Sequence, residues 1–195
     1  MEQQLYELFE QYNGYLASKL IRGNRAHYYQ LKTMLAEGKA VQIKRGLYRH
    51  TDFTEDADWG EVCRIVPQGV LCLFTAWQFH DLSTHVSSLV HLAISVRKKP
   101  VLPEFPPVKI YFWKDDYFEI GKIETTHNGQ QISIYDLEKS VCDAIRYRNK
   151  VGTELSAEVL RNYLKRKDRN LDKLMKYAEN MRITTVLNQY LSVML

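Results

Sequence analysis

Hydrophobic positions at helical spacing open the chain. Residues 3–12 (QQLYELFEQY) carry four apolar side chains on one predicted helical face, with acidic residues between them. YLASKLI, residues 15–21, predicts a second, short amphipathic helix. Asn24 is a suitable cap for a third helix over residues 25–37, and Gly38 is a suitable terminator.

Apolar residues then alternate with polar ones, which predicts strands. AVQI (residues 40–43) and LYRH (residues 47–50) flank a Lys-Arg-Gly turn at residues 44–46, where the glycine allows the positive φ of a tight reversal. The order helix, helix, turn, helix, hairpin is the layout of a winged helix-turn-helix. We therefore expect such a domain over residues 1–52.

A polar, acidic stretch at residues 51–60 predicts a domain boundary. Beyond it, strand-like segments come first and helical periods last. We expect residues 60–195 to form a mixed α/β domain that ends in a helical bundle, and the whole chain to be α+β. The expected elements are a helix within residues 69–82, strands at 89–96 and 108–113, a hairpin turning at Asn128-Gly129, and helices at 136–148, 156–166, 170–180 and 183–195.

Basic side chains are concentrated near the N-terminus. The net charge of the chain is +4, yet residues 19–49 contain eight Lys and Arg and only one acid, which gives +7. From residue 51 onward, 19 basic and 19 acidic residues cancel. Such a local surplus attracts polyanions, of which nucleic acid and an anionic lipid surface are the two candidates.

The third helix of a winged helix-turn-helix enters the major groove of DNA. With Tyr28, Leu31 and Leu35 turned toward the core, the opposite face of the helix would meet DNA. The residues predicted to contact DNA are Arg25, His27, Tyr29, Gln30 and Lys32 of this helix, and Lys44 and Arg45 of the hairpin. Arg25 suits bidentate recognition of guanine, whereas Tyr29 and Lys32 suit phosphate contacts.

Two alternatives to DNA binding remain open for this basic region. Each of the residues taken singly fits a solvated basic face, and only their clustering together with the element order favours DNA. Binding to a membrane surface is the weaker rival, because the helix lacks a broad apolar face that is free of core packing.

A second basic cluster lies between residues 161 and 176, where seven Lys and Arg accompany two acids. The cluster would extend the DNA-binding surface, meet an acidic partner, or form a solvated corner between helices. Its candidate interaction residues are Arg161, Lys165, Arg166, Lys167 and Arg169.

Catalytic motifs are missing from the sequence, which contains no GxSxG, Walker-type loop, HExxH or Gly-rich dinucleotide turn. Asp136 suits an N-cap, and Glu138 suits the start of the helix dipole. Asp143 lies one turn from Lys139, which predicts an exposed ion pair. We therefore expect no enzymatic activity, no metal ion and no cofactor; a nuclease-like enzyme tethered to DNA by the winged helix is the alternative.

The sequence also bears on the cellular location. No apolar run approaches the ~20 residues that span a bilayer, and Met1 leads into a polar segment without a signal peptide. The three cysteines show no CxxC spacing, which favours buried thiols in a reducing compartment. The protein is therefore expected to be cytoplasmic, with no membrane partner.

Three stretches of the chain resemble AbiEi-type antitoxins. Residues 15–48, which end in Arg-Gly-Leu-Tyr, resemble the N-terminal winged helix of that family. Residues 69–82 (GVLCLFTAWQFHDL) resemble the helix after the wing, although Asp81 stands where the family commonly has glycine. Residues 132–152, with the segment Lys-Ser-Val-Cys-Asp, resemble a strand–helix segment of the family. The resemblance covers most of the chain.

This resemblance implies a bacterial antitoxin of a type IV toxin–antitoxin system, which acts in phage defence by abortive infection. Family members repress their own operon through the winged helix, often at inverted repeats, so the implied partner is double-stranded operator DNA. Their C-terminal domain is implicated in counteracting a nucleotidyltransferase-like toxin without a stable complex. A ligand-responsive transcription regulator is a milder variant of the same hypothesis.

Overall fold

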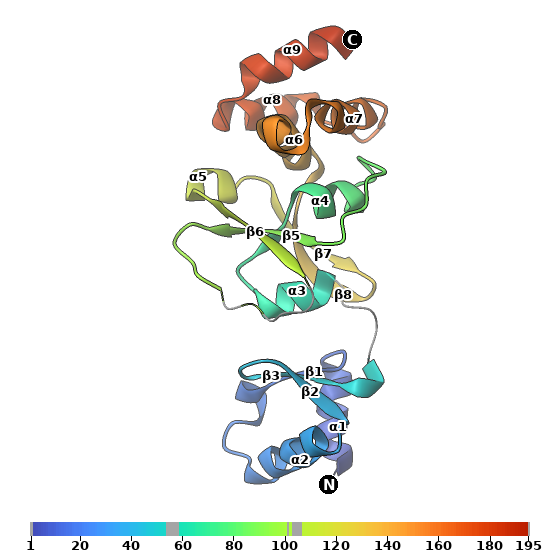
Figure 1. The fold of residues 1–195 in the computed structure, drawn as a ribbon, viewed down its shortest axis with the longest axis vertical. Coiled ribbons are helices and arrows are strands. Elements are labelled where there is room, and N and C mark those ends of the chain that lie inside the picture. Colours follow the sequence, from blue (N-terminus) through green and yellow to red (C-terminus); the bar gives the residue numbers. More distant parts are fainter. Residues whose placement is uncertain (1, 54–58, 101, 103–106, 195) are drawn as a thin grey trace.

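The computed structural model in Figure 1 describes residues 2–53, 59–100, 102 and 107–194. Its described part is a mixed α+β structure with nine α-helices and two sheets, which confirms the predicted fold class at that level. The molecule is elongated: one small sheet with its helices lies at the N-terminal end, a larger sheet lies in the middle, and a layer of helices lies at the C-terminal end (Figure 1).

We call residues 2–53 the N-terminal unit. Its strands form an antiparallel sheet in the order β1-β3-β2, so β3 is the central strand. Leu5 and Phe9 of its first helix pack against Leu31 and Met34 of its second helix in one buried cluster. The elements are α1 (Glu2–Gln11), β1 (Tyr15–Ala17), the 3₁₀ helix η1 (Ser18–Ile21), α2 (Arg25–Ala36), β2 (Ala40–Lys44), β3 (Leu47–His50) and the 3₁₀ helix η2 (Thr51–Phe53).

The helix predicted over residues 15–21 is wrong, because this segment forms strand β1 and one turn of 3₁₀ helix. Tyr15 pairs with Arg49, and Ala17 pairs with Leu47. Pairing with β3 satisfies backbone groups that so short a helix would leave open at both ends. A seven-residue pattern does not reveal this pairing, since the partner strand lies much later in the chain.

Helix α2 confirms the predicted third helix, with one change to its inward face. The side chain of Asn24 caps the helix by accepting a hydrogen bond from the backbone N of His27 at 3.1 Å. Leu31 and Met34 are buried, as their spacing predicts, but Tyr28 is 40 % exposed. A tyrosine at the edge of a small core packs its ring and leaves its hydroxyl in water.

The second sheet is mixed and has the strand order β6-β5-β4-β8-β7. β5 and β6 are parallel, as are β4 and β8, whereas β7 and β8 form an antiparallel hairpin. The turn predicted at Asn128-Gly129 is confirmed, and both residues have the positive φ that a tight hairpin turn requires. The elements up to this point are α3 (Trp59–Ile65), β4 (Val70–Leu71), α4 (Leu73–Phe79), β5 (Val90–Ser95), β6 (Val108–Trp113), α5 (Asp115–Phe118), β7 (Lys122–His127) and β8 (Gln130–Tyr135).

The helical layer contains α6 (Leu137–Val151), α7 (Thr153–Leu164), α8 (Leu171–Asn180) and α9 (Thr184–Met194). Helix α6 is the centre of this layer and packs against α4, α7, α8 and α9. Residues 137–145 are therefore buried on every side of the helix, polar and charged side chains included. No described helix combines the length and the apolar character that crossing a membrane requires.

Candidate nucleic-acid interface

Three of the predicted contact residues form one exposed stripe along α2. Arg25, Tyr29 and Lys32 are spaced i, i+4 and i+7, so they lie on the same helical face. All three residues are exposed, and Tyr29 is 75 % exposed. Among the described residues, neither Arg25 nor Lys32 has an ion-pair or side-chain hydrogen-bond partner. The stripe therefore presents two available cations on either side of an accessible aromatic ring.

Two other predicted contact residues, His27 and Gln30, lie on the opposite side of α2 from this stripe, because the ~3.6-residue turn of the helix places them near the buried Met34. Both are half-buried, and His27 contributes its backbone N to the helix cap. Oε1 of Gln30 is buried, and no described group donates a hydrogen bond to it. These two side chains are thus less accessible than the sequence suggested, and they lie outside the exposed stripe.

The hairpin turn places its two cations differently. Nζ of Lys44 donates a hydrogen bond to the carbonyl oxygen of Ile65 at the end of α3, and burial lowers the pKa of Lys44. Arg45 is exposed and has no ion-pair partner among the residues that the structure describes. Lys44 is therefore not a free cation at an open hairpin tip, as the sequence suggested, because the turn faces α3 (Figure 1). Only Arg45 remains available there.

A buried carboxylate joins the N-terminal unit to the rest of the chain. Glu61 of α3 is 1 % exposed, and its Oε2 accepts hydrogen bonds from the hydroxyl of Tyr15 at 2.8 Å and from Nη1 of Arg49 at 2.6 Å. The guanidinium of Arg64 lies over the ring of Tyr15, 4.6 Å from its centroid. Sequence reasoning missed this joint, since Glu61 follows directly on the acidic stretch that predicted a boundary.

Apolar packing continues across the same joint. Tyr15 and Leu47 of the N-terminal unit belong to one buried cluster with Val62 and Ile65 of α3. Burial and the neighbouring Glu61 raise the pKa of Tyr15, so its hydroxyl stays a hydrogen-bond donor at neutral pH. The N-terminal unit is therefore docked on α3 by both apolar and charged contacts.

The second basic cluster divides into structural and available cations. Arg166 binds both carboxylate oxygens of Asp168 at 2.8 and 2.9 Å and donates from Nη1 to the carbonyl of His80. Arg169 donates to the carbonyl of Arg166 at 2.8 Å. Of the five candidate residues, Arg161, Lys165 and Lys167 are exposed and have neither an ion pair nor a side-chain hydrogen bond in the described ranges. Three of the five candidate residues therefore remain available for an interaction.

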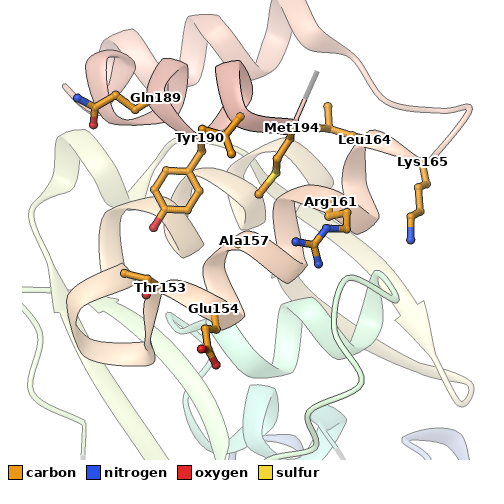
Figure 2. A pocket seen from close by; sticks show the side chains of 10 residues that line it. Thr153, Glu154, Ala157, Arg161, Leu164, Lys165, Gln189, Tyr190 and Met194 are labelled. Carbon is orange, nitrogen blue, oxygen red and sulfur yellow. The ribbon is translucent and has the colours of Figure 1, made fainter.

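A groove of about 910 Å³ adjoins these cations between α7 and α9. Figure 2 shows Tyr190 and Met194 reaching from α9 toward α7, which carries Arg161 and Leu164 and is followed directly by Lys165. Apolar side chains and two available cations therefore meet on this surface.

The carboxylates of α6 all have structural partners. Asp136 caps the helix as predicted, and Nζ of Lys173 lies 3.0 Å from both Asp136 Oδ2 and Glu138 Oε2. Lys139 and Asp143 form the predicted ion pair at 2.6 Å, but the prediction that the pair is exposed is wrong, because α6 lies at the centre of the helical layer. Within the described ranges, no cluster of three or more His, Cys, Asp or Glu side chains is arranged to hold a metal ion.

No model of a known protein family matches the chain, and a search of the curated proteins finds no match either. The function has to be inferred from the residues of the chain and their geometry.

Proposed function

We propose that the N-terminal unit is a winged helix-turn-helix that binds duplex DNA, with α2 as the recognition helix. The order α1-β1-η1-α2-β2-β3 supports this proposal, since it places a helix with an exposed face directly before a two-stranded hairpin. The surplus of basic residues in this part of the chain supports it further, because it favours association with the phosphate backbone.

The single observation that carries the proposal is the exposed stripe of Arg25, Tyr29 and Lys32. Arg25 lies in the first turn of α2, and a guanidinium at that position suits the O6 and N7 acceptors of guanine. Tyr29 and Lys32 follow on the same face and suit contacts to phosphate. Arg45 adds a phosphate contact from the hairpin.

We propose further that the chain is an autorepressor and antitoxin that counteracts a nucleotidyltransferase-like toxin without a stable complex. The resemblance of residues 15–48, 69–82 and 132–152 to AbiEi-type antitoxins supports this step. Arg161, Lys165 and Lys167 are the candidate residues for it, because their charges have no partner in the described part of the chain. The nuclease-like alternative has less support, since Asp136 and Glu138 pair with Lys173 of α8 and Asp143 pairs with Lys139 within α6.

Binding of the purified chain to the DNA upstream of its own gene tests the first proposal, by fluorescence anisotropy. With ~4–6 phosphate contacts, the logarithm of the association constant should fall with the logarithm of salt concentration at a slope of about −4 to −5. Arg25→Ala should weaken operator binding by about 1–3 kcal/mol. Lys150→Ala, which removes an exposed cation of α6, is the matched control and should bind as the unaltered chain does. A flat salt dependence contradicts the proposal.

The antitoxin step needs a cellular readout. Co-expression of the chain with a nucleotidyltransferase-like toxin should restore growth, and the triple change Arg161→Ala, Lys165→Ala and Lys167→Ala should reduce that rescue. Failure of the unaltered chain to restore growth contradicts the antitoxin proposal and leaves the DNA-binding proposal to the anisotropy measurement.

A further inference from the structure

A cavity of about 260 Å³ lies between β6, α5 and α6. Trp113, Tyr117 and Tyr147 contribute aromatic rings to its lining, and Asp143 of α6 lines it as well. It belongs to the sheet and helical layer, whereas the proposed DNA-binding stripe lies on α2 in the N-terminal unit. A ligand in this cavity is therefore independent of the proposed DNA contacts.

Asp143 has an unused hydrogen-bond acceptor. The side chain is 1 % exposed, and its Oδ1 accepts from Nζ of Lys139 at 2.6 Å. Its Oδ2 is buried and has no hydrogen-bond partner among the described residues. A buried carboxylate oxygen without a donor is unfavourable, so a ligand that supplies an N–H group at this point would be stabilised.

The aromatic lining is held in place by its own contacts. Nε1 of Trp113 donates to the hydroxyl of Tyr147 at 2.5 Å. The guanidinium of Arg146 lies 4.0 Å from the centroid of the Tyr117 ring, and its Nη1 donates to the carbonyl of Met181 at 3.1 Å. Flat rings in fixed positions favour a ligand that is itself planar, because aromatic rings stack on one another.

Two exposed cations also line the cavity. Arg146 and Lys114 both contribute to the lining, and Lys114 has no ion-pair partner in the described part of the chain. These charges disfavour a cationic ligand, which an aromatic cavity with a carboxylate would otherwise suit. They favour a ligand with an anionic group at its exposed end.

We propose that this cavity binds a nucleoside monophosphate. A base N–H group donates to Oδ2 of Asp143, the base stacks on the aromatic lining, and the phosphate lies between Lys114 and Arg146. The volume of the cavity lies just below the usual range of about 300–1,000 Å³ for ligand pockets, so it limits the ligand to at most one nucleotide and excludes a dinucleotide.

The indole N–H of Trp113 is a local reporter of this site. The chain has three tryptophans, and ¹H–¹⁵N spectra resolve one indole signal from each; the Trp113→Phe variant assigns the signal of Trp113. Titration of the full chain with AMP, GMP, CMP and UMP should shift the Trp113 signal saturably for at least one of them, while the signals of Trp59 and Trp77 stay in place. The absence of a saturable shift at millimolar concentration for all four overturns the proposal.

Matched variants separate recognition of the base from recognition of the phosphate. Lys114→Gln should weaken binding of the monophosphate by about tenfold and leave binding of the free nucleoside unchanged, because Arg146, which also holds the ring of Tyr117, is kept. Lys176→Gln removes an exposed cation of α8 outside the cavity and should change neither. Equal affinity of Lys114→Gln and the unaltered chain for the monophosphate contradicts the proposed phosphate site.

Two further experiments test whether the base is recognised. Tyr117→Leu keeps the cavity apolar but removes a stacking surface, so it should weaken binding of nucleoside and monophosphate alike. This variant is preferred to Asp143→Asn, which also leaves Lys139 without its buried partner. Inorganic phosphate should leave the Trp113 signal in place at the concentrations that saturate the nucleotide; an equal shift with phosphate alone shows a simple anion site and overturns the proposal.

Discussion

Lys32 of α2 and Lys139 of α6 are the same side chain in opposite surroundings. Lys32 is exposed, and no carboxylate pairs with it in the described part of the chain. Lys139 is fully buried, lies 2.6 Å from Asp143, and places its ammonium 4.2 and 4.1 Å from the ring centroids of Trp113 and Tyr135. The first charge is available to a ligand, whereas the second is engaged in a buried ion pair.

The difference follows from where each helix lies. Helix α2 covers a small core from one side, so a full face remains in solvent. Helix α6 is enclosed by the sheet and the four helices α4, α7, α8 and α9, so every charge in its first half needs an internal partner. A cluster of basic residues therefore indicates a binding surface only where the core leaves the cluster exposed.

The substitution with the largest expected effect on stability removes the buried cation. Lys139→Met leaves the carboxylate of Asp143 buried without a partner, and the free energy of unfolding should fall by about 3–5 kcal/mol. The double change Lys139→Met and Asp143→Leu should recover most of that loss, because both charges are then gone. Urea unfolding followed by circular dichroism measures both effects.

The matched control for this experiment is Lys32→Met on α2. An exposed cation without a partner contributes little to stability, so the change should stay within about 0.5 kcal/mol. A loss of several kcal/mol for Lys32→Met, or a negligible loss for Lys139→Met, contradicts the assignment of one charge to the surface and the other to the interior.

A buried histidine extends the comparison to a group whose charge depends on pH. His91 is almost fully buried, with Nδ1 2.9 Å from the hydroxyl of Tyr111 and Nε2 3.0 Å from Oγ of Ser87. Burial, aided by the nearby charge of Lys109, lowers the pKa of His91 to about 4. The neutral ring is thus favoured in the folded state, while the unfolded chain takes up a proton below about pH 6.5.

The folded protein should therefore lose stability as the pH falls from about 6.5 through 4. The contribution of His91 is fully present above pH 6.5 and declines by up to about 3 kcal/mol by pH 4. Other groups also titrate in this interval, Asp143 among them, since burial raises its pKa to about 6. The measurement is consequently the difference between the unaltered chain and His91→Gln in urea unfolding across this pH range. Parallel stability profiles for the two proteins contradict the assignment.

Local signals explain which parts of the structure could be predicted. Asn24 and Asp136 cap the helices that they were expected to cap, and Asn128-Gly129 turns the expected hairpin. Each of these features depends on residues within a few positions of one another, so the sequence contains the whole interaction.

Partners that lie far apart in the chain explain the rest. The strand at residues 15–17 depends on β3, and the joint at Glu61 depends on Tyr15 and Arg49. The i, i+4 spacing of Lys139 and Asp143 correctly indicated an ion pair, but burial of the pair depends on neighbouring helices that such spacing does not report. The availability of a charge, which decides the candidate site, is a tertiary property.

The adjacent residues Lys44 and Arg45 of the hairpin turn show the same difference between an engaged and an available cation. Their substitution has the smallest expected effects. Lys44 donates to the carbonyl of Ile65, whereas Arg45 is exposed and has no partner in the described ranges. Lys44→Ala should lower the free energy of unfolding by about 1 kcal/mol, since it removes one partly buried hydrogen bond from a charged donor. Its effect on operator affinity should be small.

Arg45→Ala should leave the free energy of unfolding unchanged and weaken DNA binding. Because one phosphate contact is lost, the affinity should fall for all DNA sequences alike, and the slope of the salt dependence should decrease by about 1. Urea unfolding measures the stability of both variants, and fluorescence anisotropy measures their affinity for the operator. Lys44→Ala should change mainly the stability, and Arg45→Ala should change mainly the affinity. If Lys44→Ala weakens DNA binding as much as Arg45→Ala and also lowers the free energy of unfolding by about 1 kcal/mol, the hairpin turn leaves α3 when DNA binds. The contact between Lys44 and Ile65 would then belong to the DNA-free state, and the docked position of the N-terminal unit would itself change with operator binding.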